Sequence, residues 1–241
     1  MSKKVAIEIG TGKKFLIKDS TSEFHTASGI LSPKDIQKGG RIKSTKGETF
    51  IILEPQFADL WEMFARGPQV MIHKDIGLII TKTGVNKDSM VLDAGGGSGS
   101  LCLSLANICK EVTVYEINAE HYDVITKNKK LLGFENLTLK HQDIYKGIDE
   151  ANLDLITFDL PEPWKALPHA SKALKEGGHL VVYLPNLTQA QEFVKSLKGS
   201  KVSFVEMVEL IERKWKIEDK ILRPEFQMLG HTGFLIFCRK W

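Results

Sequence analysis

A glycine-rich run over 95–99 follows directly on an apolar stretch, 90–94, that predicts a buried strand. Glycine lets a backbone turn sharply and approach a ligand closely, and such loops bind nucleotides at the carboxyl ends of parallel strands. Gly95, Gly97 and Gly99 are spaced by two and lack the G-x-G-x-x-G spacing of dinucleotide-binding loops. The run therefore indicates a nucleotide-type ligand and argues against NAD and FAD.

Acidic side chains follow the next predicted strands in order. Glu116 ends the stretch 111–116, about twenty residues beyond the glycines, where a carboxylate can accept both ribose hydroxyls of an adenosine. The alternative for Glu116 is an exposed acid at a helix N-terminus. Asp143 and Ile144 follow the predicted strand 137–141, and they are placed to contact an adenine ring. The glycine run, Glu116 and Asp143 thus stand at the ends of three successive strands, which favours an adenosine-containing ligand.

The fourth strand, predicted over 153–159, ends at a rigid loop. Pro161 and Pro163 fix the backbone φ on either side of Glu162, so Asp159 is held in place at the strand end. The alternative for Asp159 is an N-cap of the next helix, which Pro161 disfavours because it intervenes. We expect Asp159 to serve the chemistry of the site.

Apolar strand patterns alternate with helical patterns from about residue 66 onward. Such alternation predicts a mostly parallel sheet with helices on both faces. Its seven strands are expected near 90–94, 111–116, 137–141, 153–159, 178–184, 202–211 and 233–238. Short strand-like runs at 5–9, 14–18 and 49–53 predict a small β-rich domain, and a helical pattern over 56–66 follows it. We place the domains at 1–65 and 66–241.

The composition is that of an ordinary globular protein, with 42% hydrophobic and 26% charged residues and a formal net charge of +3. That charge is too small to demand a polyanionic partner. We expect no metal site, because the three cysteines form no close ligand pair, and buried thiols are the simplest interpretation, although an intersubunit disulfide remains open. No apolar run reaches the length of a membrane-spanning helix and no signal peptide is recognisable, so we expect a cytoplasmic protein with no membrane partner.

Five stretches carry a resemblance to known methyltransferases, and four of them resemble one family. The D-x-G-x-G-x-G run from Asp93 resembles the first motif of Rossmann-like class I methyltransferases that bind S-adenosylmethionine. The sequence Asp-Leu-Pro-Glu-Pro-Trp over 159–164 resembles the fourth motif of the tRNA adenine N1-methyltransferases, which make 1-methyladenosine in the T-loop. The stretches 66–75, 183–189 and 223–235 are similar to further segments of that family. The resemblance implies a seven-stranded class I methyltransferase domain, a small N-terminal β domain and a homotetramer bound to the T-loop and elbow of tRNA.

The resemblance also implies a set of site residues. It assigns the catalytic role to Asp159, which would also touch the cofactor. The cofactor-binding residues it implies are Gln69, Met71, Gly95, Gly97, Ser98, Gly99, Ser100, Glu116, His121, Asp143 and Ile144. Three positions depart from the family pattern. Many relatives carry glutamate where Asp93 stands and an aromatic residue near Ile72 and His73, and relatives can place arginine at the position of His121.

The chemistry agrees with this set. Adenine N1 is a neutral lone pair at neutral pH, so it attacks a sulfonium methyl group without first losing a proton. The product is a cation, and a fixed carboxylate near the exocyclic amine favours the transition state. Two rival hypotheses remain: a methyltransferase of this cofactor fold with another substrate, and a non-catalytic tRNA-binding subunit. Basic residues for RNA contact are expected at Lys34, Lys38, Arg41, Lys43 and Lys46, and at Arg213, Lys214, Lys216 and Arg223 beside Trp215.

Overall fold

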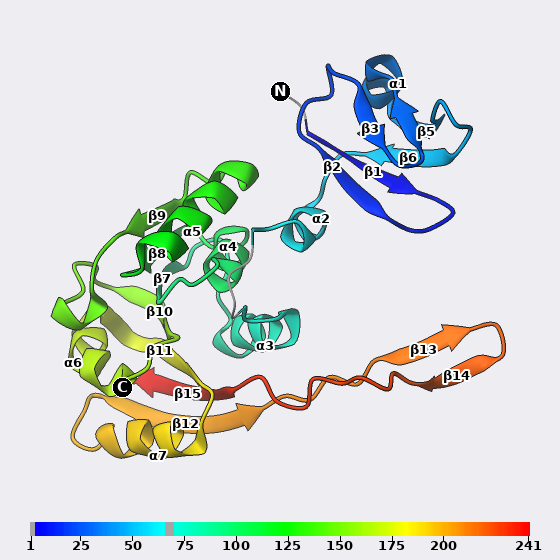
Figure 1. The fold of residues 1–241 in the computed structure, drawn as a ribbon. Helices are drawn as coiled ribbons and strands as arrows, with labels where there is room; N and C mark the ends of the chain where they lie inside the picture. The colour runs from blue at the N-terminus through cyan, green and yellow to red at the C-terminus, as the bar shows by residue number, and fades with distance from the viewer. Residues whose placement is uncertain (1–2, 66–69) are drawn as a thin grey trace. The chain divides into compact units, whose positions relative to one another are not determined.

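The computed structural model describes residues 3–65 and 70–241. They form two compact units that divide between Phe64 and Ala65, and both are drawn in Figure 1. Gln69, which the resemblance assigns to cofactor binding, lies outside the described residues.

The first unit is a small β structure. Its elements are β1 Lys4–Glu8, β2 Lys14–Ile17, β3 Phe24–Thr26, β4 Gly29–Leu31, α1 Pro33–Lys38, β5 Gly40–Lys43, β6 Thr49–Leu53 and α2 Phe57–Glu62. An antiparallel sheet runs in the order β2-β1-β6-β5, and β3 pairs with β4. Ile17, Leu31, Ile36 and Phe50 are fully buried in its core. The sequence predicted β1, β2 and β6 but not the short elements between residues 24 and 43.

The second unit contains the predicted seven-stranded sheet. The strands are β7 Met90–Ala94, β8 Glu111–Tyr115, β9 Leu137–Lys140, β10 Leu153–Phe158, β11 Leu174–Leu184, β12 Val202–Glu209 and β15 Phe234–Lys240. Their order is β12-β15-β11-β10-β7-β8-β9, and only β15 runs antiparallel to its neighbours. The expected mostly parallel sheet is confirmed.

Helices cover both faces of this sheet. They are α3 His73–Thr83, α4 Ser100–Ala106, α5 Ala119–Leu132, the short 3-10 turn η1 Ile144–Lys146, α6 Pro163–Ala173 and α7 Leu187–Ser196. Figure 1 shows α3, α4 and α5 on one side of the strands and α6 and α7 on the other. The central strands are apolar on both faces, with Leu92, Ile156, Phe158 and Leu180 almost inaccessible, because a sheet covered twice has no solvent face.

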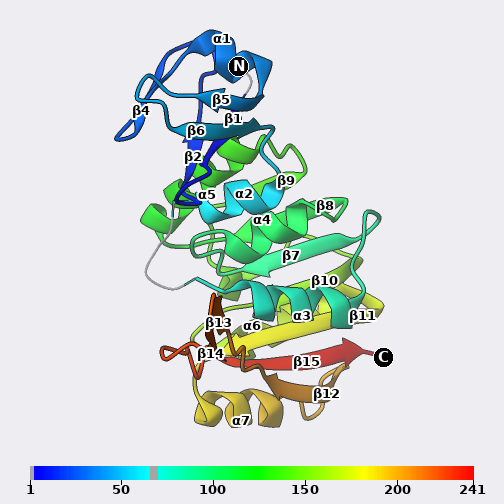
Figure 2. The same cartoon turned by 90° about the vertical axis from the view of Figure 1, so that its right-hand side faces the viewer.

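A long arm leaves the sheet after β12 and returns at β15. It carries the hairpin of β13 Trp215–Glu218 and β14 Ile221–Pro224, which stands away from the rest of the unit in Figure 1. Figure 2 shows the sheet and its helices from the side, with the hairpin turned toward the viewer. Trp215, Ile217, Leu222 and Phe226 are all more than half exposed. The arm therefore has no apolar core of its own.

All three cysteines are buried and free. This agrees with the interpretation of the cysteines as buried thiols. Within residues 3–65 and 70–241, no helix is both long and apolar enough to cross a membrane.

The glycine run depends on close packing at Gly96, which generates a test of the fold. A Cβ atom there would lie 2.6 Å from Val114 Cγ1 and 2.6 Å from Ile125 Cδ1. We expect Gly96→Ala to lower the free energy of unfolding by about 1–3 kcal/mol, the usual cost of overpacking. Chemical denaturation followed by circular dichroism measures this difference.

Gly77→Ala is the matched control. Gly77 lies within α3 and has nothing within 4 Å of a Cβ position, so alanine should be neutral or stabilising by about 1 kcal/mol. Equal stability of Gly96→Ala and the wild type would show that the loop is not packed as described.

Candidate active site

A cavity of about 370 Å³ opens at the carboxyl ends of β7, β8, β9 and β10. That volume suits a nucleoside-sized ligand. A smaller hollow of about 20 Å³ shares part of its lining. Both spaces are lined by Gly95, Gly97, Ser98 and Asp159, so Asp159 stands where the two meet.

The glycine run wraps around Glu116. Gly97 has a φ of +54° and Gly99 one of +88°, in the left-handed region that favours glycine. The Gly97 amide donates to Glu116 Oε2 at 2.8 Å, and a Cβ on Gly97 would point into open space. Gly99 does something different: its Cβ position lies 2.9 Å from Leu103, so this glycine serves helix packing and does not line the cavity.

Glu116 is held from two sides and is only 5% exposed. Its Oε2 accepts from Gly97 and its Oε1 accepts the Asn118 amide at 2.7 Å. His121 Nδ1 lies 3.7 Å from Oε2 at the rim of the cavity. The carboxylate is therefore fixed with lone pairs left for a ligand in the cavity.

Asp159 is positioned by its own backbone. Its amide donates to the Ala94 carbonyl at 2.7 Å, which joins the end of β10 to the end of β7. The following loop is tied down because Gln189 donates to the Pro161 carbonyl at 3.0 Å and the Glu162 amide donates to the Tyr145 hydroxyl at 3.2 Å. Two hydrogen bonds thus hold the loop whose backbone the two prolines restrict.

The Asp159 carboxyl is accessible through the open cavity, yet protein surrounds it on most sides. This desolvation, together with the charge of Glu116, raises the pKa of Asp159 to about 6. Such a group is ionised at neutral pH and becomes neutral in mild acid.

Asp93 is a third carboxyl at the same place. It is 2% exposed, and Thr157 Oγ1 donates to its Oδ1 at 2.5 Å. Burial raises the pKa of Asp93 to about 7 against the effect of that hydrogen bond, and the charges of Asp159 and Glu116 add to the rise. Among the described residues that line the two spaces there is no lysine or arginine. The site is therefore anionic and suits a cationic ligand.

The other predicted site residues line either the large cavity or the smaller hollow. Asp143 and Ile144 line the large cavity, where Asp143 Oδ1 also accepts the Tyr145 amide and so caps η1. Met71 and Ser100 line the smaller hollow, and Ser100 Oγ lies 3.1 Å from Ser98 Oγ. The structure thus brings together every predicted residue that it describes except Gly99.

Sequence analysis missed several residues that line the cavity or support its wall. Asn128 of α5 is 2% exposed and donates to the Ser98 carbonyl at 3.1 Å, which pins the glycine run to the helix. The lining residues of the large cavity that were not predicted as site residues are Tyr115, Ile117, Asn118, Gln142, Tyr145, Leu160 and Pro161, although the last two belong to the stretch 159–164 that the sequence singled out. Most directly follow a strand end, which is the signal that could have found them. No group of three or more potential metal ligands occurs within the residues that the structure covers.

Comparison with known proteins identifies the family. Residues 49–223 match the family model described as the tRNA methyltransferase complex GCD14 subunit. A curated tRNA (adenine(57)-N(1)/adenine(58)-N(1))-methyltransferase of Methanocaldococcus jannaschii is 34% identical, over 95% of this chain and 92% of its own length. A tRNA (adenine(58)-N(1))-methyltransferase of Thermus thermophilus is 32% identical, over 84% of this chain and 82% of its own.

Solved structures give the same picture. A SAM-dependent O-methyltransferase from Thermotoga maritima superposes with a TM-score of 0.86 at 28% identity, covering 99% of this chain and 92% of that one. A tRNA (m1A58) methyltransferase from Aquifex aeolicus superposes with a TM-score of 0.78 at 27% identity, covering 100% and 97%. With a glycine run, an anionic cavity and a family match over residues 49–223, this chain belongs to the GCD14 family of tRNA methyltransferase subunits.

Proposed function

We propose that the protein is an S-adenosylmethionine-dependent tRNA methyltransferase that converts an adenine of the T-loop, at conventional position 58, to 1-methyladenosine. The adjacent adenine at position 57 is a second candidate target, because the Methanocaldococcus jannaschii relative is named for both positions. The observation that carries the proposal is Asp159, whose backbone is anchored to β7 and whose carboxyl lies where the cofactor cavity meets the smaller hollow.

The cavity fits the cofactor by charge and by shape. S-adenosylmethionine carries a sulfonium and an ammonium group, and it supplies an activated methyl group when bound. Glu116 would accept the ribose hydroxyls, while Asp143 and Ile144 would face the adenine ring. The open space beside Gly97 would admit the ligand to the backbone, and Met71, Ser98 and Ser100 would surround its amino-acid end. His121 at the rim is our remaining candidate contact.

Asp159 would act on the target adenine through charge. The attacking N1 needs no base, but the ring becomes cationic as the new bond forms. A carboxylate that accepts from the exocyclic amine stabilises that developing charge. The rigid Pro161–Pro163 loop keeps the group in place, so little reorganisation is needed during the reaction.

The rival hypotheses are weaker on this evidence. A non-catalytic subunit has no need of the intact glycine run, Glu116 and Asp159 around an open cavity. The O-methyltransferase from Thermotoga maritima shares the fold, but a fold does not set the target atom. The curated relatives with the highest coverage are named as tRNA adenine N1 enzymes, which favours tRNA as the substrate.

Two sets of basic residues are our candidates for RNA contact. In the first unit Lys34, Lys38, Arg41 and Lys43 are exposed. In the arm, Arg213 and Lys214 are exposed, and the Arg223 guanidinium lies 3.7 Å from the centre of the Phe226 ring. Such groups neutralise phosphates and stack on unpaired bases.

The chain would act as a homotetramer in the cytoplasm, where its tRNA substrate is found. The arm supports this assembly, because a two-stranded hairpin is marginally stable alone and this one exposes Trp215, Ile217 and Leu222. Further copies of the chain would cover these side chains. The partial exposure of Phe204 and Met207 on β12 supports the same view.

The direct test is to incubate the protein with S-adenosylmethionine and an unmodified tRNA transcript. We expect 1-methyladenosine in the T-loop, detected by mass spectrometry of the digested RNA and mapped by reverse-transcription stops. Asp159→Asn should lower the single-turnover rate by about 10²-fold, the scale of losing one charge-stabilising group, with little change in cofactor affinity. Cofactor binding without 1-methyladenosine would reject the substrate, and a full rate in Asp159→Asn would reject its role.

The raised pKa of Asp159 predicts a pH dependence. Below a pH of about 6 the carboxyl is protonated and loses its charge, so methyl transfer should slow as the pH falls. We expect kcat/KM for the cofactor to rise between pH 5 and 7 and then level off, with a step shared by Asp93 and Asp159 because the two carboxyls interact. A flat profile in the wild type between pH 5 and 8 would contradict this assignment.

Multi-angle light scattering tests the assembly. We expect a mass about four times the 27.0 kDa of one chain. Replacing Ile217 and Leu222 with aspartate should shift the mass downward, since charges would then lie where apolar contacts are expected. A single-chain mass for the wild type would exclude the tetramer.

A further inference from the structure

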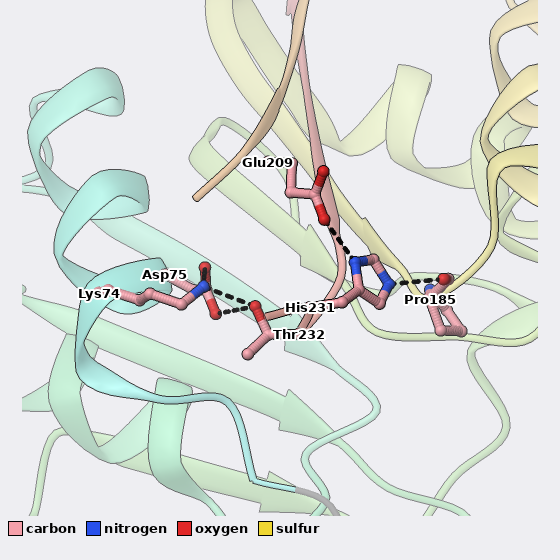
Figure 3. A network of polar contacts seen from close by, with 6 residues as sticks. All are labelled: Lys74, Asp75, Pro185, Glu209, His231 and Thr232. Atoms are coloured by element: carbon pink, nitrogen blue, oxygen red, sulfur yellow. Dashed lines mark hydrogen bonds and ion pairs between the residues drawn. The ribbon is translucent and has the colours of Figure 1, made fainter. Parts of the chain in front are cut away.

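Two polar clusters meet at His231 and Thr232 (Figure 3). These residues lie just before β15, which begins at Phe234, at the point where the arm rejoins the sheet. One cluster reaches α3 and the other reaches the ends of β11 and β12. We call Asp75, Glu209, His231 and Thr232 the latch. None of these four residues lines the cofactor cavity.

Thr232 closes a buried ion pair. Its hydroxyl donates to Asp75 Oδ2 at 2.9 Å and accepts from Lys74 Nζ at 2.6 Å. Lys74 also donates to Asp75 Oδ1 at 2.8 Å, and the Asp75 side chain is only 1% exposed. Without the Thr232 hydroxyl, one oxygen of a buried carboxylate would lose this donor, which is costly for a charged group. Thr232 is therefore bound tightly to the start of α3.

His231 bridges two strand ends. Its Nδ1 lies 2.6 Å from Glu209 Oε1 and its Nε2 lies 2.9 Å from the Pro185 carbonyl oxygen. A carboxylate and a carbonyl can only accept, so both ring nitrogens carry protons and the imidazole is cationic. Glu209 and Pro185 raise the pKa of His231, and Lys74 opposes them. His231 thus fixes the arm to the loop that follows β11.

Tyr183 connects the latch with the active site. Its hydroxyl is hydrogen-bonded to Thr232, and its pKa is raised to about 12, mainly by burial and also by the charges of Asp75 and Asp159. The ring packs on Gly233, where a Cβ atom would lie 2.5 Å from Tyr183 Cζ. Tyr183 therefore lies within electrostatic reach of both Asp75 and Asp159.

The elements joined by the latch connect to residues on either side of Asp159 in the chain and in the hollow. Helix α3 begins two residues after Met71, which lines the hollow beside Asp159. Strand β11 ends in the loop at Pro185, and Gln189 of α7 holds the Pro161 carbonyl of the Asp159 loop. A shift at His231 or Thr232 would thus move walls on two sides of Asp159.

We propose that Thr232 and His231 are positioning residues for methyl transfer, which lock the base of the arm to α3 and to the end of β11 and so set the mouth through which adenine reaches Asp159. This inference rests on the proposed tRNA methyl transfer. Contacts that hold the arm, whether to RNA or to another copy of the chain, would then bear on the geometry around Asp159. The four latch residues do not line the cofactor cavity, so the rate of methyl transfer should change more than the affinity for the cofactor.

The test compares Thr232→Val, Thr232→Ser and Thr138→Val in the full-length protein. Thr138 is an exposed strand residue of β9 and serves as the matched control. We expect Thr232→Val to lower the single-turnover rate with tRNA about tenfold, with the cofactor dissociation constant changed by less than about twofold. Thr232→Ser keeps the hydroxyl and should restore most of the rate. Equal loss in the serine and valine variants, or no loss in either, would overturn the proposal.

The pH profile gives a second readout. Neutral His231 has one N–H and can satisfy only one of its two acceptors, so the rate should fall as the pH rises through its raised pKa. His231→Asn should lack this alkaline limb, whereas His25→Asn, which removes an exposed histidine beside Glu23, should keep it. An unchanged alkaline limb in His231→Asn would remove His231 from the latch.

Hydrogen exchange separates this inference from the proposed function. In the protein without RNA, Thr232→Val should speed amide exchange over 71–76 and 183–187, while Thr138→Val should not. If the wild type failed to methylate tRNA, the proposed function would fall, and the exchange data would still decide whether the latch holds these segments. Unchanged exchange in Thr232→Val would show that it does not.

Discussion

The active site depends on an accumulation of negative charge that the described lining residues do not neutralise with lysine or arginine. Asp93, Glu116 and Asp159 converge on one glycine run, each brought there by the carboxyl end of a parallel strand or the residue after it. Backbone amides hold Glu116 and a threonine holds Asp93, while Asp159 keeps its carboxyl open to the cavity. Burial, and after it the like charges nearby, raise the pKa values of Asp93 and Asp159, and the resulting anionic pocket suits a cationic ligand. The same three carboxyl groups would thus form the cofactor pocket and, through Asp159, supply the charge that stabilises the transition state.

The fold serves this arrangement by fixing the strand ends. The Asp159 amide bonds to the Ala94 carbonyl, and Gly96 packs too closely on Val114 and Ile125 to accept a side chain. Asn128 holds the Ser98 carbonyl from α5. On the far side of Asp159, the latch holds the base of the arm. In our proposal the strand ends and the latch have separate roles. The strand ends position the cofactor, and the latch positions the entrance for the target base.

The sequence was sufficient for the sheet because each strand is a short apolar run bounded by turns, and all seven predicted strands are present. It was also sufficient for strand-end residues such as Glu116 and Asp143, since parallel strands bring their carboxyl ends to one edge. It could not predict that Gly99 faces Leu103, because the spacing of glycines does not show which way a Cβ would point. Likewise the arm, the Asn128 contact and the Thr232 contact with Asp75 join residues far apart in the chain, and no local pattern encodes them.

The central claim is that Asp159 stands beside the amine of the adenine that is methylated. The most direct measurement is a crystal structure of the protein with S-adenosylmethionine or its demethylated product and a T-loop RNA. The account predicts an Asp159 oxygen about 3 Å from the exocyclic nitrogen of the target adenine, and Glu116 at the ribose of the cofactor. An adenine bound with its N1 edge away from Asp159, or a cofactor ribose away from Glu116, would contradict it.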